Sequence, residues 1–188
     1  MTSVIETLRE EHKNIARLLN AMENQIERLA TARNPEYDLL ESIANYFCDY
    51  PDRCHHPKED VVFRRLQAKH PTEAATVGDL GKEHRDAYAR VRRFRDNIQR
   101  ISRDEILSRD SVVDAGRRFI DAEREHMRME EGVFFPLAAS VLDEEDWRSI
   151  EGSLPQRQDP LFGEVEETYK FVREFLLNWE KKNRRIEA

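Results

Sequence analysis

The strongest constraint on the fold is an internal repeat that places two similar segments 71 residues apart. The segments begin at His55 and at His126, and each has the form H-x-x-x-E-acid-x-V-F. Upstream of them, Glu-His dipeptides at 11–12 and 83–84 are spaced by 72 residues. A period of this length indicates two copies of one supersecondary unit. The two copies are residues 1–70 and 72–142.

Hydrophobic periodicity indicates that both copies are helical. Apolar residues recur at alternating steps of three and four, as on the buried face of a long amphipathic helix. These rows run from Ile5 to Leu29, over residues 36–69, from Val77 to Ile101 and from Val112 to Leu137. In the last row, Val133 is expected on the buried face. The chain has only 6 Gly and 7 Pro in 188 residues, which suits long helices and argues against a turn-rich β fold.

Two prolines fall inside the second predicted helix. Pro51 and Pro57 each remove a backbone donor and clash with the preceding turn. We therefore expect residues 36–69 to form one helical rod that is kinked or divided near one of them.

A single amphipathic hairpin cannot cover its own apolar face. Two such hairpins are expected to pack as an all-α, up-down-up-down four-helix bundle over residues 1–142. Residues 143–188 differ in composition, with a short capped helix at 143–147, a linker at 155–160 and an aromatic amphipathic helix at 169–179. We predict that this C-terminal extension packs on the bundle or on a partner, which includes a second copy of the chain.

Composition narrows the cellular setting. The formal net charge is −7 with acids and bases interspersed, which argues against a nucleic-acid partner. No apolar run approaches the ~18 residues that would suggest a membrane span, and residues 1–11 do not have the apolar segment of a signal peptide. Cys48 and Cys54 are not in a CxxC arrangement. We expect a cytoplasmic protein with reduced cysteines.

Six polar residues occupy positions where the rows would otherwise carry core residues. They are His12, His55, Glu59, His84, His126 and Glu130. In each His-x-x-x-Glu segment the two side chains share one side of a helix and can bind one ion together. Burying these groups uncompensated would cost several kcal/mol each, and a bound cation removes that cost.

The types of donor atom also restrict which metal ions would suit the site. Imidazole and carboxylate without thiolate suit iron, manganese or zinc. Two ions bridged by Glu59 and Glu130 would use all six ligands, whereas one ion would leave some unused.

The combination of His12, His55-x-x-x-Glu59, His84 and His126-x-x-x-Glu130 resembles the hemerythrin-like HHE cation-binding domain over roughly residues 1–140. The resemblance implies a bundle that holds two non-haem iron ions, bridged by an oxo or hydroxo group and by the two glutamates. It further implies that O2, NO or peroxide is bound or sensed at an open iron position.

The chain departs from the family's O2 carriers at one ligand. Those proteins have His-x-x-x-His on the third helix, whereas this chain has His84-x-x-x-Tyr88. Tyr88 is expected to ligate as a phenolate, to donate a hydrogen bond to a bound ligand, or to fill space. His56 follows His55 but is turned about 100° around an α-helix, so we interpret it as a supporting or surface residue, with direct ligation as the alternative.

A ferritin-like carboxylate centre is the alternative di-iron architecture. It uses Glu-x-x-His on two helices and a glutamate from each of the other two. Glu123-x-x-His126 has that form, but the second helix offers Asp52-x-x-His55. The first and third helices present histidine instead of glutamate, which favours the hemerythrin-like arrangement.

The sequence thus predicts a non-haem di-iron protein that binds or senses O2, NO or a related oxidant. Iron storage, or delivery of iron for repair of metal centres, would use the same ligands. A non-catalytic interaction module with a structural metal is the other alternative, and it would dock a partner through Phe171, Phe175, Leu176 and Trp179. No pocket for an organic substrate follows from the sequence, which leaves enzymatic activity open.

Overall fold

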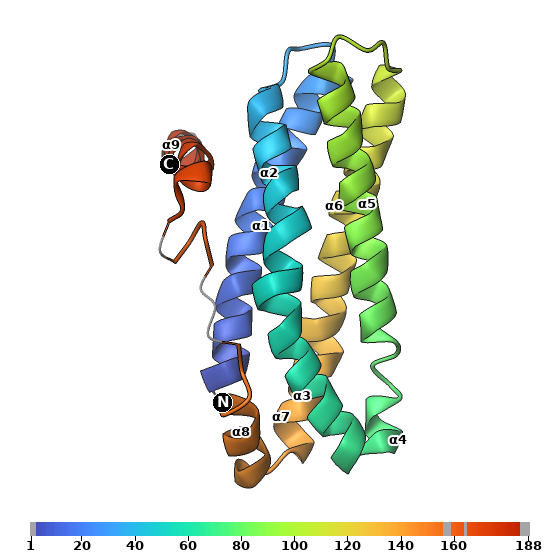
Figure 1. The fold of residues 1–188 in the computed structure, drawn as a ribbon, viewed down its shortest axis with the longest axis vertical. Coiled ribbons are helices and arrows are strands. Elements are labelled where there is room, and N and C mark those ends of the chain that lie inside the picture. Colours follow the sequence, from blue (N-terminus) through green and yellow to red (C-terminus); the bar gives the residue numbers. More distant parts are fainter. Residues whose placement is uncertain (1–2, 156–158, 164, 185–188) are drawn as a thin grey trace.

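Four helical rods stand side by side in the computed structural model of the chain, which describes residues 3–155, 159–163 and 165–184 (Figure 1). The first rod is α1 (Ser3–Ala30), and the third is α5 (Leu80–Ile101). The second rod joins α2 (Tyr37–Tyr50), η1 (Pro51–His55) and α3 (His56–Lys69). The fourth joins α6 (Arg109–Met129), η2 (Glu130–Phe134) and α7 (Phe135–Val141), and the short α4 (Pro71–Ala74) links the two halves. The predicted all-α, up-down-up-down bundle is confirmed.

The rods enclose two apolar clusters with a polar layer between them. α1 packs against α6, α6 against α5, and α5 against α2. One cluster includes Ile15 and Phe94 and fills the half that contains the α1–α2 turn. The other includes Leu8 and Phe134 and fills the half near the N-terminus. The predicted ligands lie along the chain between residues of the two clusters, as His12 does between Leu8 and Ile15.

The prolines inside the rods are accommodated by π turns. In η1 the N–H of His56 donates to the carbonyl oxygen of Pro51, and in η2 the N–H of Phe135 donates to that of Glu130. Both bonds span five residues, as in a π-helix. Each turn ends two residues before a proline, Pro57 or Pro136. Proline lacks a donor and crowds the carbonyl four residues earlier, so the wider turn lets the rod continue.

The second π turn overturns one prediction about the core. Val133 was expected on the buried face, but it is 42% exposed, whereas Phe134 is fully buried. The extra residue in η2 shifts the buried face by one position. Ala138 is accordingly buried and Leu137 only half-buried.

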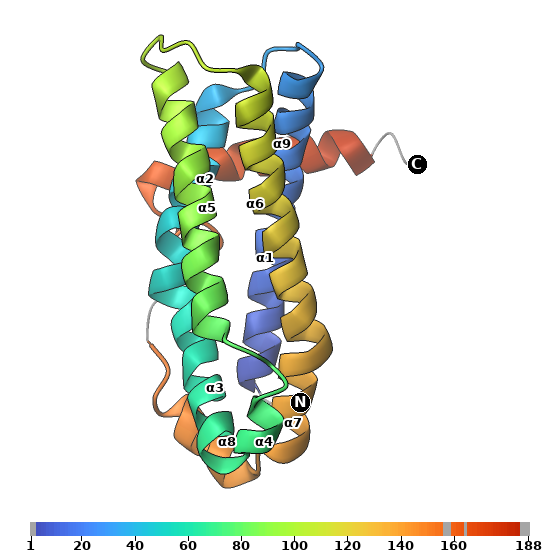
Figure 2. The same cartoon turned by 90° about the vertical axis from the view of Figure 1, so that its right-hand side faces the viewer.

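The C-terminal segment packs on the bundle. It contains α8 (Glu144–Glu151), η3 (Glu167–Tyr169) and α9 (Lys170–Arg184). α8 lies at the end of the bundle near the N-terminus, and α9 lies across α1 and α2 instead of running along them (Figure 2). Leu161, Tyr169, Val172 and Leu176 are buried in the same cluster as residues of α1 and α2. Of the predicted linker, residues 156–158 lie outside the described part of the chain.

None of the helices in the described ranges combines the length and the apolar character that a bilayer span requires.

Candidate metal centre

The polar layer of the bundle contains all six predicted ligands and one further histidine. They are His12, His55, His56, Glu59, His84, His126 and Glu130, and none of them is more than 8% exposed. The long rods position them: α1 supplies one residue, the second rod three, α5 one and the fourth rod two. Their ring nitrogens and carboxylate oxygens form two groups.

The first group joins His12, His55, Glu59 and Glu130. One donor atom from each of these residues lies within 4.8 Å of the donors of the other three. The Nε2 atoms of His12 and His55 face each other at 3.1 Å. Such a short separation between two imidazole nitrogens needs a shared proton or a cation between them.

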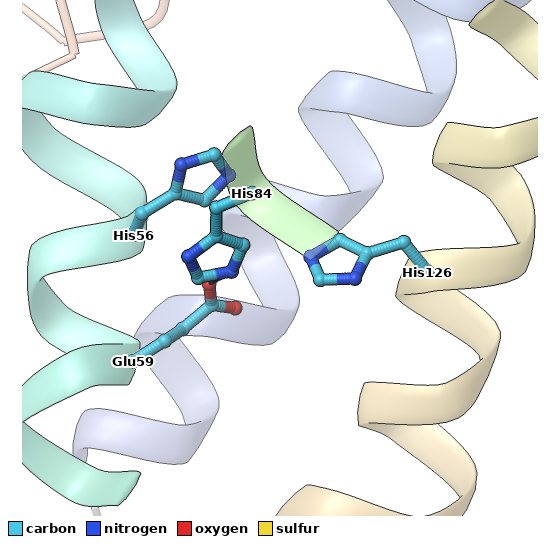
Figure 3. Close-up of side chains that lie close together, drawn as sticks. All are labelled: His56, Glu59, His84 and His126. Carbon is cyan, nitrogen blue, oxygen red and sulfur yellow. Dashed lines mark ion pairs between the residues drawn. The ribbon is translucent and has the colours of Figure 1, made fainter. Parts of the chain in front are cut away.

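The second group joins His56, Glu59, His84 and His126, again with donors within 4.8 Å of one another. Figure 3 shows the three imidazoles gathered above the Glu59 carboxylate. The rings of His56 and His84 stack, with centroids 3.7 Å apart and planes 5° from parallel. The second group therefore has three histidines where the first has two.

The two glutamates each face both groups. Glu59 Oε1 lies 3.2 Å from His55 Nε2, and Glu59 Oε2 lies 3.5 Å from His84 Nε2. Glu130 Oε2 lies 3.3 Å from His12 Nε2, and Glu130 Oε1 lies 3.1 Å from His126 Nε2. One oxygen of each carboxylate is thus directed to each group, which is the arrangement that bridging carboxylates adopt.

A carboxylate lies behind every histidine of the layer. The Nδ1 distances are 3.0 Å for His12–Glu131, 2.9 Å for His55–Glu11, 3.1 Å for His56–Asp52, 2.9 Å for His126–Glu83 and 3.9 Å for His84–Asp60. A carboxylate within hydrogen-bond distance of Nδ1, as for every one of these histidines except His84, holds the proton on that nitrogen and leaves the Nε2 lone pair free for a metal. The role of these acidic side chains was not predicted from the sequence.

The repeat contains the signal that could have found them. Glu11 contacts His55, and its counterpart Glu83 contacts His126. The acid that follows the motif glutamate is duplicated too: Glu131 lies behind His12, and Asp60 lies behind His84. The glutamate before each early histidine therefore supports the histidine of the other helix in its hairpin.

The buried donor atoms are arranged to coordinate a cation, because several of them make no hydrogen bond to one another. Both oxygens of Glu59 and of Glu130, and Nε2 of His84 and of His126, are buried without a hydrogen bond. Buried polar atoms are normally hydrogen-bonded, and buried charges are paired or coordinate metals. Close approach without hydrogen bonding is expected where lone pairs converge on a shared cation.

The carboxylates strongly change the acid–base properties of the layer. Burial alone would lower the pKa of His12, but Glu130 and Glu59 outweigh burial and raise it to about 10. The same balance raises the pKa of His126 to about 10 and that of His84 to about 9. Without a metal, protons on the imidazoles therefore compensate the two buried carboxylates.

His55 and Glu130 follow the same pattern. Burial opposes the charge of His55, but Glu59 and Glu11 raise its pKa to about 9. Burial and the charge of Glu59 act to raise the pKa of Glu130, but the surrounding imidazoles lower it to about 2.

His56 and Tyr88 differ in their relation to the layer. The π turn η1 ends at His55, and both His55 and His56 are buried. The 100° separation used to interpret His56 assumes a regular α-helix, and a π turn immediately precedes this residue. Tyr88 is half-buried on α5, one turn after His84, and its role as a ligand stays a prediction.

Comparison with protein families supplies a match over most of the chain. The family model of the hemerythrin HHE cation-binding domain matches residues 3–138. This range contains all seven residues of the polar layer and the carboxylates behind the histidines. No curated protein matches the chain.

Proposed function

The chain belongs to the hemerythrin HHE cation-binding family, and from this premise we propose that it is a non-haem di-iron protein that binds or senses O2, NO or a related oxidant. The observation that carries the proposal is the pair of buried carboxylates, Glu59 and Glu130, each with one oxygen facing each histidine group. One ion would need only one such set of donors.

In this proposal the first iron would be held by His12, His55 and one oxygen from each glutamate. The second would be held by His56, His84, His126 and the other two carboxylate oxygens. The O2 carriers of the family have a further histidine ligand where this chain has Tyr88. The proposal assigns the role of that ligand to His56. Manganese or zinc would suit the same donors, but zinc has no redox chemistry and would not supply electron transfer with O2 or peroxide.

The difference between the two donor sets favours the first ion as the site of ligand exchange. It has two nitrogen and two oxygen donors, whereas the second has three nitrogens and two oxygens. A hollow of about 450 Å³ between α1 and α6 adjoins His12, and Ala16 and Met127 contribute apolar surface to it. Small uncharged ligands such as O2 and NO suit such a hollow.

The apolar surroundings would keep water from the centre. The ring of Phe135 stacks on His12, with centroids 5.4 Å apart. Phe134 is fully buried beside it and meets Phe63 edge to face at 5.7 Å. These rings limit solvent access and lower the local polarity, which tunes bound metal ions.

The test is an optical titration of the iron-loaded chain. The reduced protein is exposed separately to O2, NO and hydrogen peroxide, and its ligand-to-iron charge-transfer absorption is followed. We expect at least one of the three to produce a new absorption band within the time of mixing. A spectrum that ignores all three would contradict the proposal and leave the metal a structural role.

A further inference from the structure

A row of stacked aromatic rings leads from the first histidine group to the C-terminal segment. The rings of His55 and Tyr50 have centroids 6.4 Å apart, and Tyr50 stacks on Tyr46 at 4.9 Å with planes 21° from parallel. Tyr46 meets Tyr169 edge to face at 5.7 Å. Each step is an ordinary aromatic contact. Three of the five tyrosines of the chain therefore lie in one continuous row.

Tyr46 has a hydrogen-bond partner that is fixed in position. Its hydroxyl is part of a fully buried side chain and donates to Asp159 Oδ2 at 2.9 Å. The other oxygen of Asp159 accepts from the backbone N–H groups of Leu161 and Phe162 at 2.8 and 3.0 Å. These two bonds orient the carboxylate, so Oδ2 is available to Tyr46.

Tyr50 lacks such a partner. Its hydroxyl is buried and makes no hydrogen bond within the described residues. A phenol that loses an electron becomes a strong acid and needs a base within hydrogen-bond reach to accept its proton. Asp159 is that base for Tyr46, whereas the carboxylate near the Tyr50 hydroxyl, Glu11, already accepts from His55 and pairs with Lys58. The site that can hold an oxidising equivalent is therefore Tyr46, and the ring of Tyr50 bridges it to His55.

We propose that Tyr46 is a redox-active tyrosine that supplies an electron to the candidate metal centre through Tyr50 and passes its proton to Asp159. The proposal rests on the proposed function, because an oxidised iron centre must accept the electron. It gives the C-terminal segment a role in redox chemistry, since Asp159 and Tyr169 both belong to it.

For electrons and protons to balance over a reaction cycle, the proposal uses a peroxide as the oxidant and a thiol as the reductant. Each Tyr46 oxidation sends one electron to the centre and one proton to Asp159. A thiol then returns one electron by way of Tyr169, Asp159 returns the proton to the Tyr46 oxygen, and the thiol proton is released. Two such rounds reduce one hydrogen peroxide to two waters with the two released protons, and the two thiyl radicals combine into a disulfide.

The test is electron paramagnetic resonance of the full, iron-loaded chain, frozen at short times after addition of hydrogen peroxide. We expect a tyrosyl radical signal, identified by its narrowing when the tyrosine rings are deuterated. Tyr46→Phe should remove this signal. Tyr37→Phe is the matched control, because Tyr37 lies at the start of α2 and outside the aromatic row, and it should leave the signal unchanged.

Asp159→Asn separates a redox role from a structural one. The asparagine oxygen can keep the bonds from the Leu161 and Phe162 N–H groups, and the amide nitrogen then faces Tyr46 and donates to its hydroxyl oxygen. The segment therefore keeps its hydrogen bonds but loses the base at Tyr46, so the melting temperature should change little. Formation of the radical should slow by about 100-fold, the lower end of what a positioned proton acceptor contributes. A merely structural Tyr46–Asp159 contact would leave the radical kinetics of this variant unchanged.

Several outcomes would overturn the proposal. A full signal in Tyr46→Phe, or wild-type kinetics in Asp159→Asn, would refute the role of these residues. If the chain binds iron and consumes peroxide without a tyrosyl signal, the relay fails while the proposed function stands. If iron content and optical response are both absent in the same samples, the proposed function fails and the relay fails with it.

Discussion

At the residue scale, the candidate metal centre depends on the acidic side chains behind its histidines. Glu11 accepts from Nδ1 of His55, and Glu83 accepts from Nδ1 of His126. Glu11 also forms an ion pair with Lys58. These contacts fix the ring orientation before a metal binds and keep the remaining proton on Nδ1 when it does, so they determine how well the Nε2 atoms converge.

Removing one of these acids should weaken metal binding without touching a ligand. We expect Glu83→Gln to lower the affinity for ferrous iron about tenfold or more, because His126 loses the charge that holds its proton on Nδ1. Glu125→Gln is the matched control, since Glu125 precedes His126 on α6 but is an exposed partner of Arg128. Competition with a chelator measures both affinities. Equal affinities in the two variants would contradict the role of Glu83.

The stability of the metal-free chain should depend on pH in a defined direction. The folded pKa values of about 10 for His12 and His126 and about 9 for His55 and His84 lie above the ordinary histidine pKa of 6.5. Their contribution is fully present below pH 6.5 and is lost as the pH rises through 9 to 10. His56 acts in the opposite direction, because burial lowers its pKa.

We therefore expect the melting temperature of the metal-free protein to fall between pH 6.5 and pH 10. Over the same range the affinity for iron should rise, because the metal no longer has to displace protons from the imidazoles. Calorimetric melting and metal titration in a series of buffers measure both trends. A metal-free protein that becomes more stable as the pH rises through 9 would contradict this account.

The sequence was sufficient to predict six residues of the polar layer, whereas it gave His56 a place there only as an alternative. His12 and His84 interrupt apolar rows, and the other four residues form two copies of one motif. Their convergence in the polar layer follows from α-helical geometry. His56 has no counterpart, since Met127 occupies the corresponding position. Its place depends on a π turn, which periodicity cannot show.

At the scale of single elements, the two π turns change which residues face the core. η1 ends at the first of two consecutive buried histidines, His55 and His56, and η2 ends at the first of two consecutive buried aromatics, Phe134 and Phe135. An extra residue per turn changes the phase of everything that follows it. Pro57 and Pro136 mark both positions in the sequence, but proline alone also permits a kink or a helix end.

A glycine on α6 sets the distance between the rods. A Cβ at Gly116 would lie 2.6 Å from Ile26 Cδ1 on α1 and 3.0 Å from Phe94 Cε2 on α5. Gly132 in η2 has nothing within 4 Å of the same position. Only glycine therefore lets α6 approach its neighbours this closely.

We expect Gly116→Ala to lower the free energy of unfolding by roughly 1–3 kcal/mol, because overpacking outweighs the better helix propensity of alanine. Gly132→Ala is the control and should leave stability unchanged or raise it by up to about 1 kcal/mol. Urea denaturation of the two variants measures the difference. Similar stabilities would show that α6 does not need this close approach.

At the scale of the whole molecule, duplication explains why ligands from four rods meet at one level. Each hairpin contributes a histidine from one helix and a His-x-x-x-Glu pair from the next, and the antiparallel rods bring both contributions into the middle of the bundle. The family match ends at residue 138, and we propose a boundary at residue 142 between the bundle and the C-terminal extension 143–188.

The extension should nevertheless contribute to the stability of the whole molecule. Leu176 on α9 is 1% exposed and belongs to the cluster shared with α1 and α2, whereas the neighbouring Leu177 is 44% exposed. We expect Leu176→Ala to cost about 2–5 kcal/mol of unfolding free energy with iron content unchanged. Leu177→Ala should cost less than about 0.5 kcal/mol. If both variants unfold like the wild type, α9 is not part of the cooperative fold.

The measurement that tests the central claim most directly is the stoichiometry of iron binding. Metal-free protein is titrated anaerobically with ferrous iron, and bound iron is quantified against chain concentration. The account predicts saturation at two iron ions per chain, with a clear loss of occupancy in Glu59→Ala, whose oxygens face both histidine groups. Saturation at one ion per chain, or full occupancy in that variant, would contradict it.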